Sequence, residues 1–418
     1  MTKPTALVLG GVSPHIAVVQ RLKALGYRVV LADYKDAPPA APFADLHLQI
    51  STLDAGAVAQ AARDEGAEAI ISVCLDQPLP ILAQVRAELG LASPLTPEAA
   101  HQLTNKDAMK QVLRSAEVDT ARWVVGPSAE SLKTDDLTFP VVAKPVGGTG
   151  SQGVIFAADR AELETQLTTC FAAARGGDVL VEEFIEGLEL SIDCIVIGGK
   201  THVLLARERH KTFFEGGSGG QEATCHATLA PAALAPETEA LMQAQARAMA
   251  QAFGLSDGPM LIQSILTAEG RLVVLEVAGR IGGGPGANRC VELVTGFDYV
   301  GASIDQQLGR PVSLELDPDP RIFSANNAYA SAGVFDQVTG MEALITEGLV
   351  EEHYVYRMQG EEIDAHLSGR ARVTAFVSAA ESREALKAQL TEVFARLDVL
   401  DPEGRSILRR EIGLHHSL

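Results

Sequence analysis

The sequence has few aromatic residues and no excess of positive charge. Aromatic residues make up 5% of the 418 residues, and there is one tryptophan. Lys and Arg number 34 against 54 Asp and Glu, which gives a net charge of −20 at pH 7. Nucleic-acid backbones and anionic membranes attract basic surfaces, so the sequence predicts neither as the main partner. A local basic pocket for a small phosphorylated ligand is compatible with this total charge.

Long apolar runs and paired cysteines are also missing. No apolar run reaches the ~18 residues of a membrane span. Residues 1–14 lack the basic start, long apolar stretch and cleavage site of a signal peptide. The five cysteines show no CxxC or Cys/His spacing, which argues against zinc and against a disulfide framework. We therefore expect a cytoplasmic protein with reduced, mostly buried thiols.

The first hundred residues alternate apolar strand patterns with helical patterns. This alternation predicts an α/β parallel sheet with helices on its faces. The predicted strands are 6–9, 28–32, 46–49 and 69–73, and the predicted helices are 14–25, 57–65 and 79–89. The last hundred residues indicate an α+β part, with strands 352–358 and 371–377 and a helix over 382–397.

The middle of the chain contains three further helices and five strands. The helices are expected at 105–116, 160–174 and 237–253, and the strands at 141–144, 179–184, 190–197, 260–266 and 272–277. Together with loops rich in Pro, Ser and Asp, these patterns predict four segments. Their bounds are 1–98, 99–188, 189–310 and 311–418.

A glycine cluster follows a predicted strand that ends in a lysine. Val141 to Pro145 includes Lys144, and seven residues from Gly147 to Gly153 include four glycines. An ammonium group and bare backbone N–H groups can together bind one anion. The pattern is not a P-loop, because no Gly-Lys-Ser/Thr follows the glycines. The alternative is a flexible hairpin with an exposed lysine.

Two more segments carry oxygen atoms suited to a nucleotide. Residues 179–191 form two predicted strands around an acidic crossing, where main-chain groups can meet an adenine edge and a carboxylate can accept from ribose. The alternative is an acidic surface hairpin. Gln263 and Glu276 lie on two strands of a predicted hairpin, in a register that lets both face one Mg²⁺ ion. Arg280 follows, and a structural Glu276–Arg280 ion pair is the alternative there.

In this order, the three signals resemble the ATP-grasp superfamily of ATP-dependent ligases. The resemblance implies a three-part architecture: a parallel-sheet pre-ATP-grasp domain, a lid subdomain and a large C-terminal α+β domain. It further implies an ATP site with one or two Mg²⁺ ions, for which Mn²⁺ is a substitute. The implied nucleotide-binding residues are Lys106, Lys144, Gly147, Gly148, Gly150, Ser151, Gly153, Glu182, Glu183, Ile185, Glu189 and Lys211.

The resemblance also assigns metal, catalytic and substrate positions. Gln263 and Glu276 are the implied metal ligands, Lys144 and Arg280 the catalytic residues, and Arg280, Gly282, Gly283 and Gly284 the substrate contacts. Many relatives have Asp or Glu at the position of Gln263, and Asn at that of Ala278. Carbamoyl phosphate synthetases have Gln at the first position. Some bacterial L-amino acid ligases have Ala at the second and keep the downstream Arg.

The implied function is ligation of a carboxylate, from an amino acid, to an amine through an acylphosphate, with release of ADP and phosphate. The implied partners are small-molecule carboxylates and amines, with a homodimer as the common state of related ligases. Three alternatives stay open at this stage. They are an ATP-grasp carboxylase similar to biotin carboxylase or purine-pathway enzymes, a nucleotide-binding ATP-grasp domain without turnover, and a nicotinamide-dependent oxidoreductase suggested by Gly10, Gly11 and Asp33.

Overall fold

The N-terminal part is a parallel sheet with strand order β3-β2-β1-β4. The computed structural model describes residues 3–148, 153–215, 221–284, 288–364 and 371–418. All five residues of β1 are buried, as expected for a central strand covered on both faces. The strands are β1 (Thr5–Leu9), β2 (Arg28–Asp33), β3 (Leu46–Gln49) and β4 (Ala67–Ile71), and the helices are α1 (Pro14–Ala24), α2 (Ala55–Asp64) and α3 (Leu79–Leu89).

A smaller antiparallel sheet follows, with strand order β5-β8-β6-β7. Two helices lead into it, and Asn105 begins the second one, because its Oδ1 accepts hydrogen bonds from Asp107 N and Ala108 N at 3.1 and 3.0 Å. The elements are α4 (Pro97–Thr104), α5 (Lys106–Ser115), β5 (Trp123–Gly126), β6 (Val141–Pro145), β7 (Ile155–Ala157), α6 (Arg160–Ala174) and β8 (Val179–Glu183). Helix α6 packs against β6 and β7.

The largest sheet has eight strands in the order β13-β12-β9-β10-β11-β14-β19-β17. The sheet contains strands from both sides of residue 310, where the sequence predicted a boundary between segments, because β14 pairs directly with β11. The strands are β9 (Leu188–Ile197), β10 (Lys200–Glu215), β11 (Gln221–Ala230), β12 (Gly258–Leu266), β13 (Leu272–Ala278), β14 (Ile322–Tyr329), β17 (Glu352–Val355) and β19 (Arg372–Ala380).

Helices and short strand pairs complete the described chain. The helices are α7 (Pro236–Ala252), α9 (Cys290–Thr295), α10 (Tyr299–Gln307), α11 (Met341–Thr346) and α12 (Arg383–Arg396). The short pairs are β15 (Gly333–Val334) with β18 (Glu362–Ile363), and β16 (Gln337–Thr339) with β20 (Asp398–Leu400). Single turns of 3₁₀ helix lie at Ala41–Phe43, Ala129–Ser131, Thr134–Asp136 and Leu414–His416.

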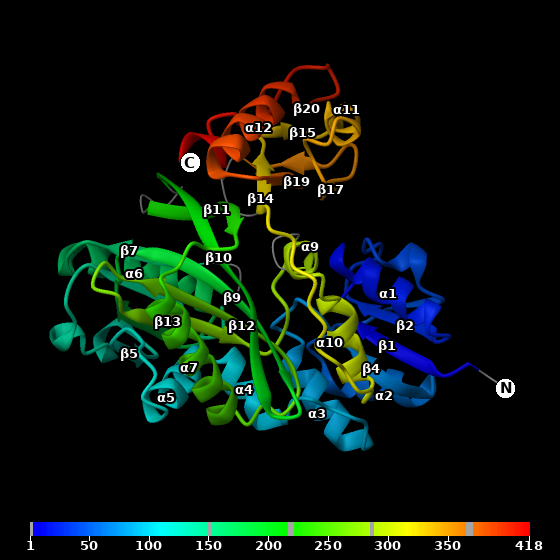
Figure 1. Cartoon of the computed structure of the whole chain (residues 1–418). Coiled ribbons are helices and arrows are strands. Elements are labelled where there is room, and N and C mark those ends of the chain that lie inside the picture. The colour runs from blue at the N-terminus through cyan, green and yellow to red at the C-terminus, as the bar shows by residue number, and fades with distance from the viewer. Residues whose placement is uncertain (1–2, 149–152, 216–220, 285–287, 365–370) are drawn as a thin grey trace.

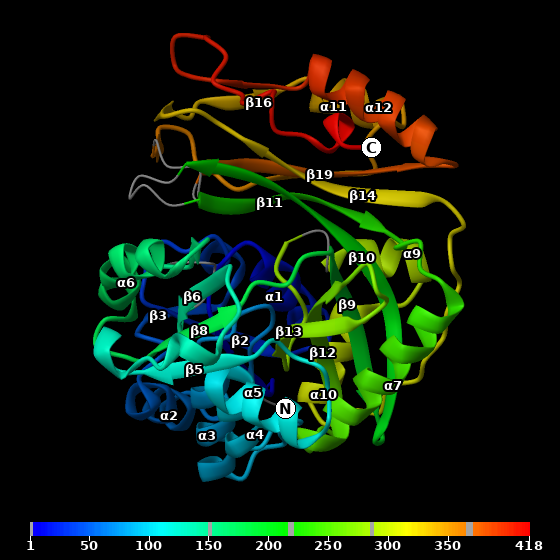
Figure 2. The same cartoon turned by 90° about the vertical axis from the view of Figure 1, so that its left-hand side faces the viewer.

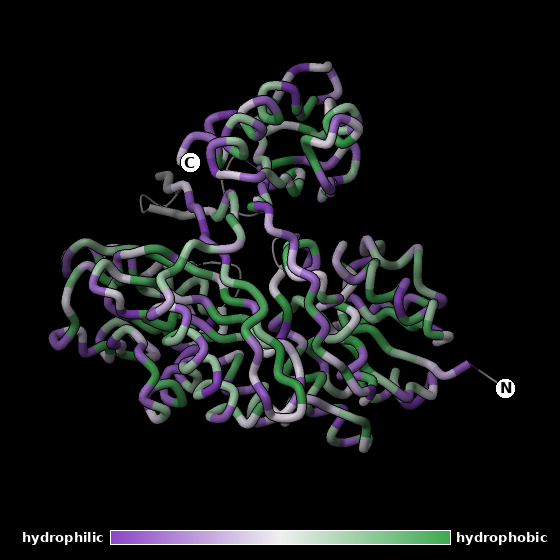
Figure 3. The backbone as a smooth tube through the Cα atoms, in the orientation of Figure 1, coloured by the Kyte–Doolittle hydropathy of each residue, from purple (hydrophilic) through white to green (hydrophobic). Residues whose placement is uncertain are grey.

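The parallel sheet and the small antiparallel sheet lie on opposite sides of β9 and β12 (Figure 1). Strands β14 and β19, which continue the same sheet, and helix α12 form the C-terminal layer above β9 and β12, as Figure 2 shows from the side. Hydrophobic residues concentrate in the strands at the centre of the molecule (Figure 3). One buried cluster contains Leu7 of β1, Ile192 of β9 and Val274 of β13, so a continuous core joins the parallel sheet to the large sheet.

The predicted mixture of an α/β parallel-sheet part with α+β parts is confirmed. All five cysteines are free and four of them are buried, as expected. Among the described residues, none of the helices combines the length and the hydropathy that crossing a bilayer requires. Strands β10, β11 and β14 were not predicted. Strand β10 carries Arg207, Arg209 and Lys211 at alternate positions. Because a strand inside a sheet is usually apolar, this charged segment was not recognised as one.

Candidate active site

Glu182 lies between two lysines at the junction of α5 with the small sheet. Its Oε2 is 2.7 Å from Lys110 Nζ, and its Oε1 pairs with Lys144 Nζ. The Lys110 and Glu182 side chains are 0% and 5% exposed. Burial raises the pKa of Glu182, but the two lysines outweigh this effect and hold the pKa below its usual value. The lysines therefore keep a buried carboxylate ionised.

Lys106 reaches the segment that begins the glycine cluster. Its ammonium group hydrogen-bonds to the carbonyl of Gly148, and more distantly to that of Val146 at 3.4 Å. Burial lowers the pKa of Lys106, although Glu276 opposes this effect. Gly153 closes the cluster with φ of +71°, and a Cβ there would lie 2.3 Å from the Ala173 side chain, so the position requires glycine. Gly147 and Gly148 are described, whereas the predicted contacts Gly150 and Ser151 lie outside the described residues.

The crossing between β8 and β9 presents its main chain and an aromatic ring. The Glu183 carboxylate accepts from Thr138 N at 2.8 Å and pairs with Arg122. Ile185, one of the predicted adenine contacts, donates no backbone hydrogen bond within the described residues. Phe184 is exposed and packs edge-on against Phe156, with ring centroids 5.2 Å apart. The crossing thus has both an unused N–H donor and an apolar face, as an adenine ring needs.

Glu189 accepts from two cations that project from β10. Its Oε1 is 2.7 Å from Arg209 Nε, and its Oε2 is 2.5 Å from Lys211 Nζ. Burial raises the pKa of Glu189, but Lys211 and Arg209 outweigh it and the pKa is lowered. The carboxylate is therefore ionised, and both cations stand next to the position predicted for a ribose.

Gln263 and Glu276 are directly opposed partners of β12 and β13, as their spacing predicted. The Glu276 carboxylate forms no ion pair within the described residues, yet it interacts electrostatically with Lys106, Arg209 and Arg280. Oxygen donors of this kind suit Mg²⁺. In the part of the chain that the structure describes, no three His, Cys, Asp or Glu side chains are arranged to hold a metal.

Arg280 does not pair with Glu276, which was the structural alternative. Instead its Nε lies 2.6 Å from Asp76 Oδ1, and its Nη2 pairs with Asp76 Oδ2. Burial lowers the pKa of Arg280, but Asp76 outweighs it and the pKa is raised. The glycine run starts beside this group, with Gly282 buried and Gly283 exposed. Gly284, with φ of +81°, is the last described residue of the run.

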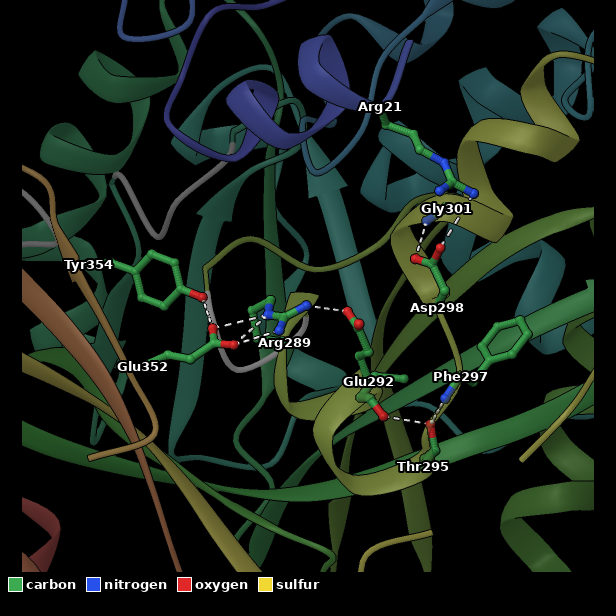
Figure 4. A network of polar contacts seen from close by, with 10 residues as sticks. Arg21, Arg289, Glu292, Thr295, Phe297, Asp298, Gly301, Glu352 and Tyr354 are labelled. Atoms are coloured by element: carbon green, nitrogen blue, oxygen red, sulfur yellow. Dashed lines mark hydrogen bonds and ion pairs between the residues drawn. The ribbon is translucent and has the colours of Figure 1, made fainter. Parts of the chain in front are cut away.

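Arg289 connects the segment after the glycine run to the C-terminal layer (Figure 4). It precedes α9, and its Nε lies 2.9 Å from Glu352 Oε1 on β17. Its Nη1 pairs with Glu292, and the Tyr354 hydroxyl donates to Glu352. Figure 4 shows Arg289 between the two glutamates, so the same side chain fixes α9 and β17.

Sequence reasoning missed three charged residues at the candidate active site: Asp76, Lys110 and Arg209. Lys110 follows Lys106 by four residues on a predicted helix, and this spacing places both on one face. Arg209 and Lys211 alternate on β10 and so share a face, but the strand itself was not recognised. Nothing in the local pattern around Asp76 indicates its role, because its partner Arg280 lies 204 residues away.

The chain is similar to several known proteins in sequence and in fold. Residues 104–285 match the family described as phosphoribosylglycinamide synthetase, ATP-grasp (A) domain. Over 334 residues the chain is 26% identical to a phosphoribosylamine–glycine ligase of Chlorobaculum tepidum, covering 76% of this chain and 77% of the relative. The L-amino acid ligase structure from Bacillus licheniformis is similar with a TM-score of 0.80 and 21% identity, over 96% of this chain and 100% of that one.

A phosphoribosylglycinamide synthetase structure from Anaerococcus prevotii is similar with a TM-score of 0.75 and 18% identity, over 96% of this chain and 100% of that one. The fold and the matched domain together define an ATP-dependent ligase of the class that forms carbon–nitrogen bonds. The match over residues 104–285 and the similarity of fold support the resemblance to the ATP-grasp superfamily that the sequence predicted.

Proposed function

We propose that this ligase activates a carboxylate, with an amino acid as substrate, as an acylphosphate and joins it to an amine, releasing ADP and phosphate. One observation carries the proposal. The Glu276 carboxylate, which is opposite Gln263 and has no ion pair in the described part of the chain, lies within the electrostatic reach of Lys106, Arg209 and Arg280, which come from three distant parts of the chain. Cations around a carboxylate that faces a second oxygen donor suit a triphosphate held through a divalent ion.

In this proposal the nucleotide lies between the small sheet and β12–β13. Lys106, Lys144 and Lys211 contact phosphates, and the crossing residues Glu182, Glu183 and Ile185 meet the adenine edge. Glu189 accepts from the ribose hydroxyls, for which Arg209 already holds it ionised. The resemblance implies that the segment 147–153, of which 149–152 lie outside the described residues, covers the phosphates and excludes water, which would hydrolyse an acylphosphate.

Gln263 and Glu276 hold Mg²⁺ in this proposal. When bound, the ion neutralises charge on the phosphate oxygens. Since only one of the two residues is a carboxylate, we expect the protein to bind Mg²⁺ weakly when no nucleotide is present. The positive charges of Lys106 and Arg209, which act on Glu276, add to this neutralisation.

Arg280 binds the transferred phosphoryl group or the substrate carboxylate, since its planar guanidinium suits a two-point contact with either anion. Asp76 already holds this guanidinium from the parallel sheet, so the arginine is oriented before substrate arrives. The backbone of Gly282, Gly283 and Gly284 supplies an anion nest next to it. Lys144 and Arg280 are thus the proposed catalytic residues.

An amino-acid substrate is supported by the pattern Glu276-Val277-Ala278-Gly279-Arg280, which resembles bacterial L-amino acid ligases. The match over residues 104–285 supports a second candidate, a purine-pathway reaction of the kind that the phosphoribosylamine–glycine ligase relative is named for. Both candidates use a carboxylate, an amine and ATP, and they differ in the amine. The homodimer implied by the resemblance and the cytoplasmic location expected from the cysteine pattern stay predictions.

The deciding experiment measures phosphate release with pairs of amino acids, and with glycine plus a phosphorylated ribosylamine, and identifies products by mass spectrometry. We expect ADP and an amide product with an amino-acid pair. Product from glycine and the ribosylamine alone would establish the second candidate. Nucleotide binding without ADP formation across both sets would contradict the ligase, and Lys144→Ala supplies the inactive control.

A further inference from the structure

A cavity lies where the parallel sheet meets the large sheet, beside the candidate active site. Helix α3 supplies one wall, and α10, which packs against both β4 and β12, supplies another. Arg280 lies on its lining, as do Ser303 and Gln307 of α10. The volume open to the centre of a water molecule is about 20 Å³. That is room for one or two water-sized species, since a single one needs roughly 10–15 Å³ by this measure.

The lining contains a buried arginine with no acidic partner. Arg86 on α3 is 1% exposed, and its Nε donates to the Ile70 carbonyl at 2.9 Å. Its Nη2 donates to Gln307 Oε1 at 3.1 Å. Among the described residues, no Asp or Glu forms an ion pair with Arg86. Burial lowers the pKa of Arg86 to about 9, so the guanidinium is still charged at neutral pH.

Two acidic side chains lie close to the cavity without forming an ion pair with Arg86 among the described residues. Asp76 pairs with Arg280, and Asp257, which also lines the cavity, accepts from Gly198 N at 3.0 Å through Oδ1. A buried charge without a counter-charge is costly, and a bound anion removes that cost. Arg86 thus differs from Arg280, whose charge Asp76 already balances.

One other polar group of the lining has a free donor. The Ser303 hydroxyl is buried and has no hydrogen-bond partner in the described structure. Gln307 is fixed, because its Oε1 accepts from Ser72 N at 3.2 Å and its Nε2 donates to the Ser303 carbonyl at 3.3 Å. Both polar atoms of the Gln307 side chain are therefore already engaged in hydrogen bonds. A guanidinium and a free hydroxyl are what remains for a ligand.

We propose that this cavity binds one small monovalent anion, of the size and charge of chloride, between Arg86 and Ser303. The available volume excludes a phosphate ester or nucleotide, and the charge favours an anion over water. The bound ion ties α3 of the parallel sheet to α10, which packs on β12 of the large sheet. The inference does not depend on the proposed ligase reaction.

Thermal unfolding in sodium chloride and in sodium gluconate at equal ionic strength tests the proposal. Gluconate is too large for the cavity, so we expect a saturable rise in Tm with chloride alone. Gln307→Glu places a carboxylate on Arg86 and should abolish this difference. Gln60→Glu adds the same charge on the surface of α2 and should leave the difference intact.

Two further measurements keep the test decisive if Gln307→Glu does not fold. Ser303→Ala should weaken the apparent chloride affinity several-fold with little change in folding. Crystals grown in bromide should show an anomalous peak within hydrogen-bond distance of the Arg86 guanidinium. A Tm that responds equally to chloride and gluconate, or a cavity that holds water alone in bromide, would overturn the proposal.

Discussion

Arg280 and Asp76 form a two-point ion pair across two sheets, with Arg280 Nε 2.6 Å from Asp76 Oδ1. Asp76 follows β4 of the parallel sheet, and Arg280 follows β13 of the large sheet. Both side chains are mostly buried. The position of the arginine therefore depends on how the two sheets meet, and not on the glycine run alone.

We expect Arg280→Lys to lower kcat/KM for ADP formation by about 100-fold, because an ammonium group cannot form the two parallel contacts. Asp76→Asn keeps the shape of the carboxylate but removes its charge, and a smaller loss of about 10-fold should follow. Arg63→Lys, in a half-exposed pair with Glu88, is the matched control and should keep full activity. Equal activity of Arg280→Lys and wild type would remove Arg280 from the mechanism.

The opposed pair Gln263 and Glu276 predicts how metal dependence responds to charge. Glu276→Ala should abolish ADP formation, and excess chelator should do the same to the wild type. Gln263→Glu adds a second carboxylate, so the Mg²⁺ concentration for half-maximal activity should fall several-fold. Glu269→Ala, on the exposed turn of the same hairpin, should change neither. A titration of activity with Mg²⁺ measures all three, and full turnover in chelator contradicts the metal role.

The buried contact of Glu182 with Lys110 predicts a loss of stability when one partner is removed. Lys110→Met leaves Glu182 with Lys144 alone, and it also removes the hydrogen bond to Thr120 Oγ1 at 2.7 Å. The free energy of unfolding should fall by about 3 kcal/mol, measured by denaturant titration. Arg63→Ala in the half-exposed Arg63–Glu88 pair should change it by less than about 0.5 kcal/mol. Similar losses in both variants would show that the contact with Lys110 is not special.

His15 predicts a pH-dependent stability. It is completely buried at the start of α1, both ring nitrogens lack partners in the described structure, and burial lowers its pKa from 6.5 to about 4. Between pH 6.5 and pH 4, His15 binds a proton in the unfolded chain but not in the folded one. The contribution of neutral, buried His15 to the free energy of unfolding is therefore complete above pH 6.5 and is lost as the pH falls toward 4. The linked change amounts to about 3 kcal/mol.

His15→Leu should therefore flatten the decline in unfolding free energy between pH 7 and pH 4.5, measured by denaturant titration at each pH. Part of the decline should remain, because burial also lowers the pKa of His226 and of His415 to about 4. His101→Leu, at an exposed position on α4, is the control and should leave the slope unchanged. An identical slope in His15→Leu and wild type would contradict the prediction.

Local patterns in the sequence were enough to predict the parallel sheet, because three of its strands contain short apolar runs, at 6–9, 29–32 and 69–71, and alternate with helices. The opposition of Gln263 and Glu276 followed from hairpin spacing alone. Strand β10 and the role of Asp76 did not follow. Charged side chains on β10 are compensated by Asp193 and Glu189 on its neighbour β9, and such pairing is invisible before the strands are aligned.

The continuity of the eight-stranded sheet has a practical consequence for anyone shortening the chain. Strand β14 pairs with one edge of β11, and β19 pairs with the other edge of β14. A fragment that stops at residue 310 would leave the backbone donors and acceptors of β11 open along one side, inviting self-association between copies. Residues 1–310 should accordingly be produced together with the C-terminal layer, because β14 of that layer pairs with the edge of β11 that would otherwise be exposed.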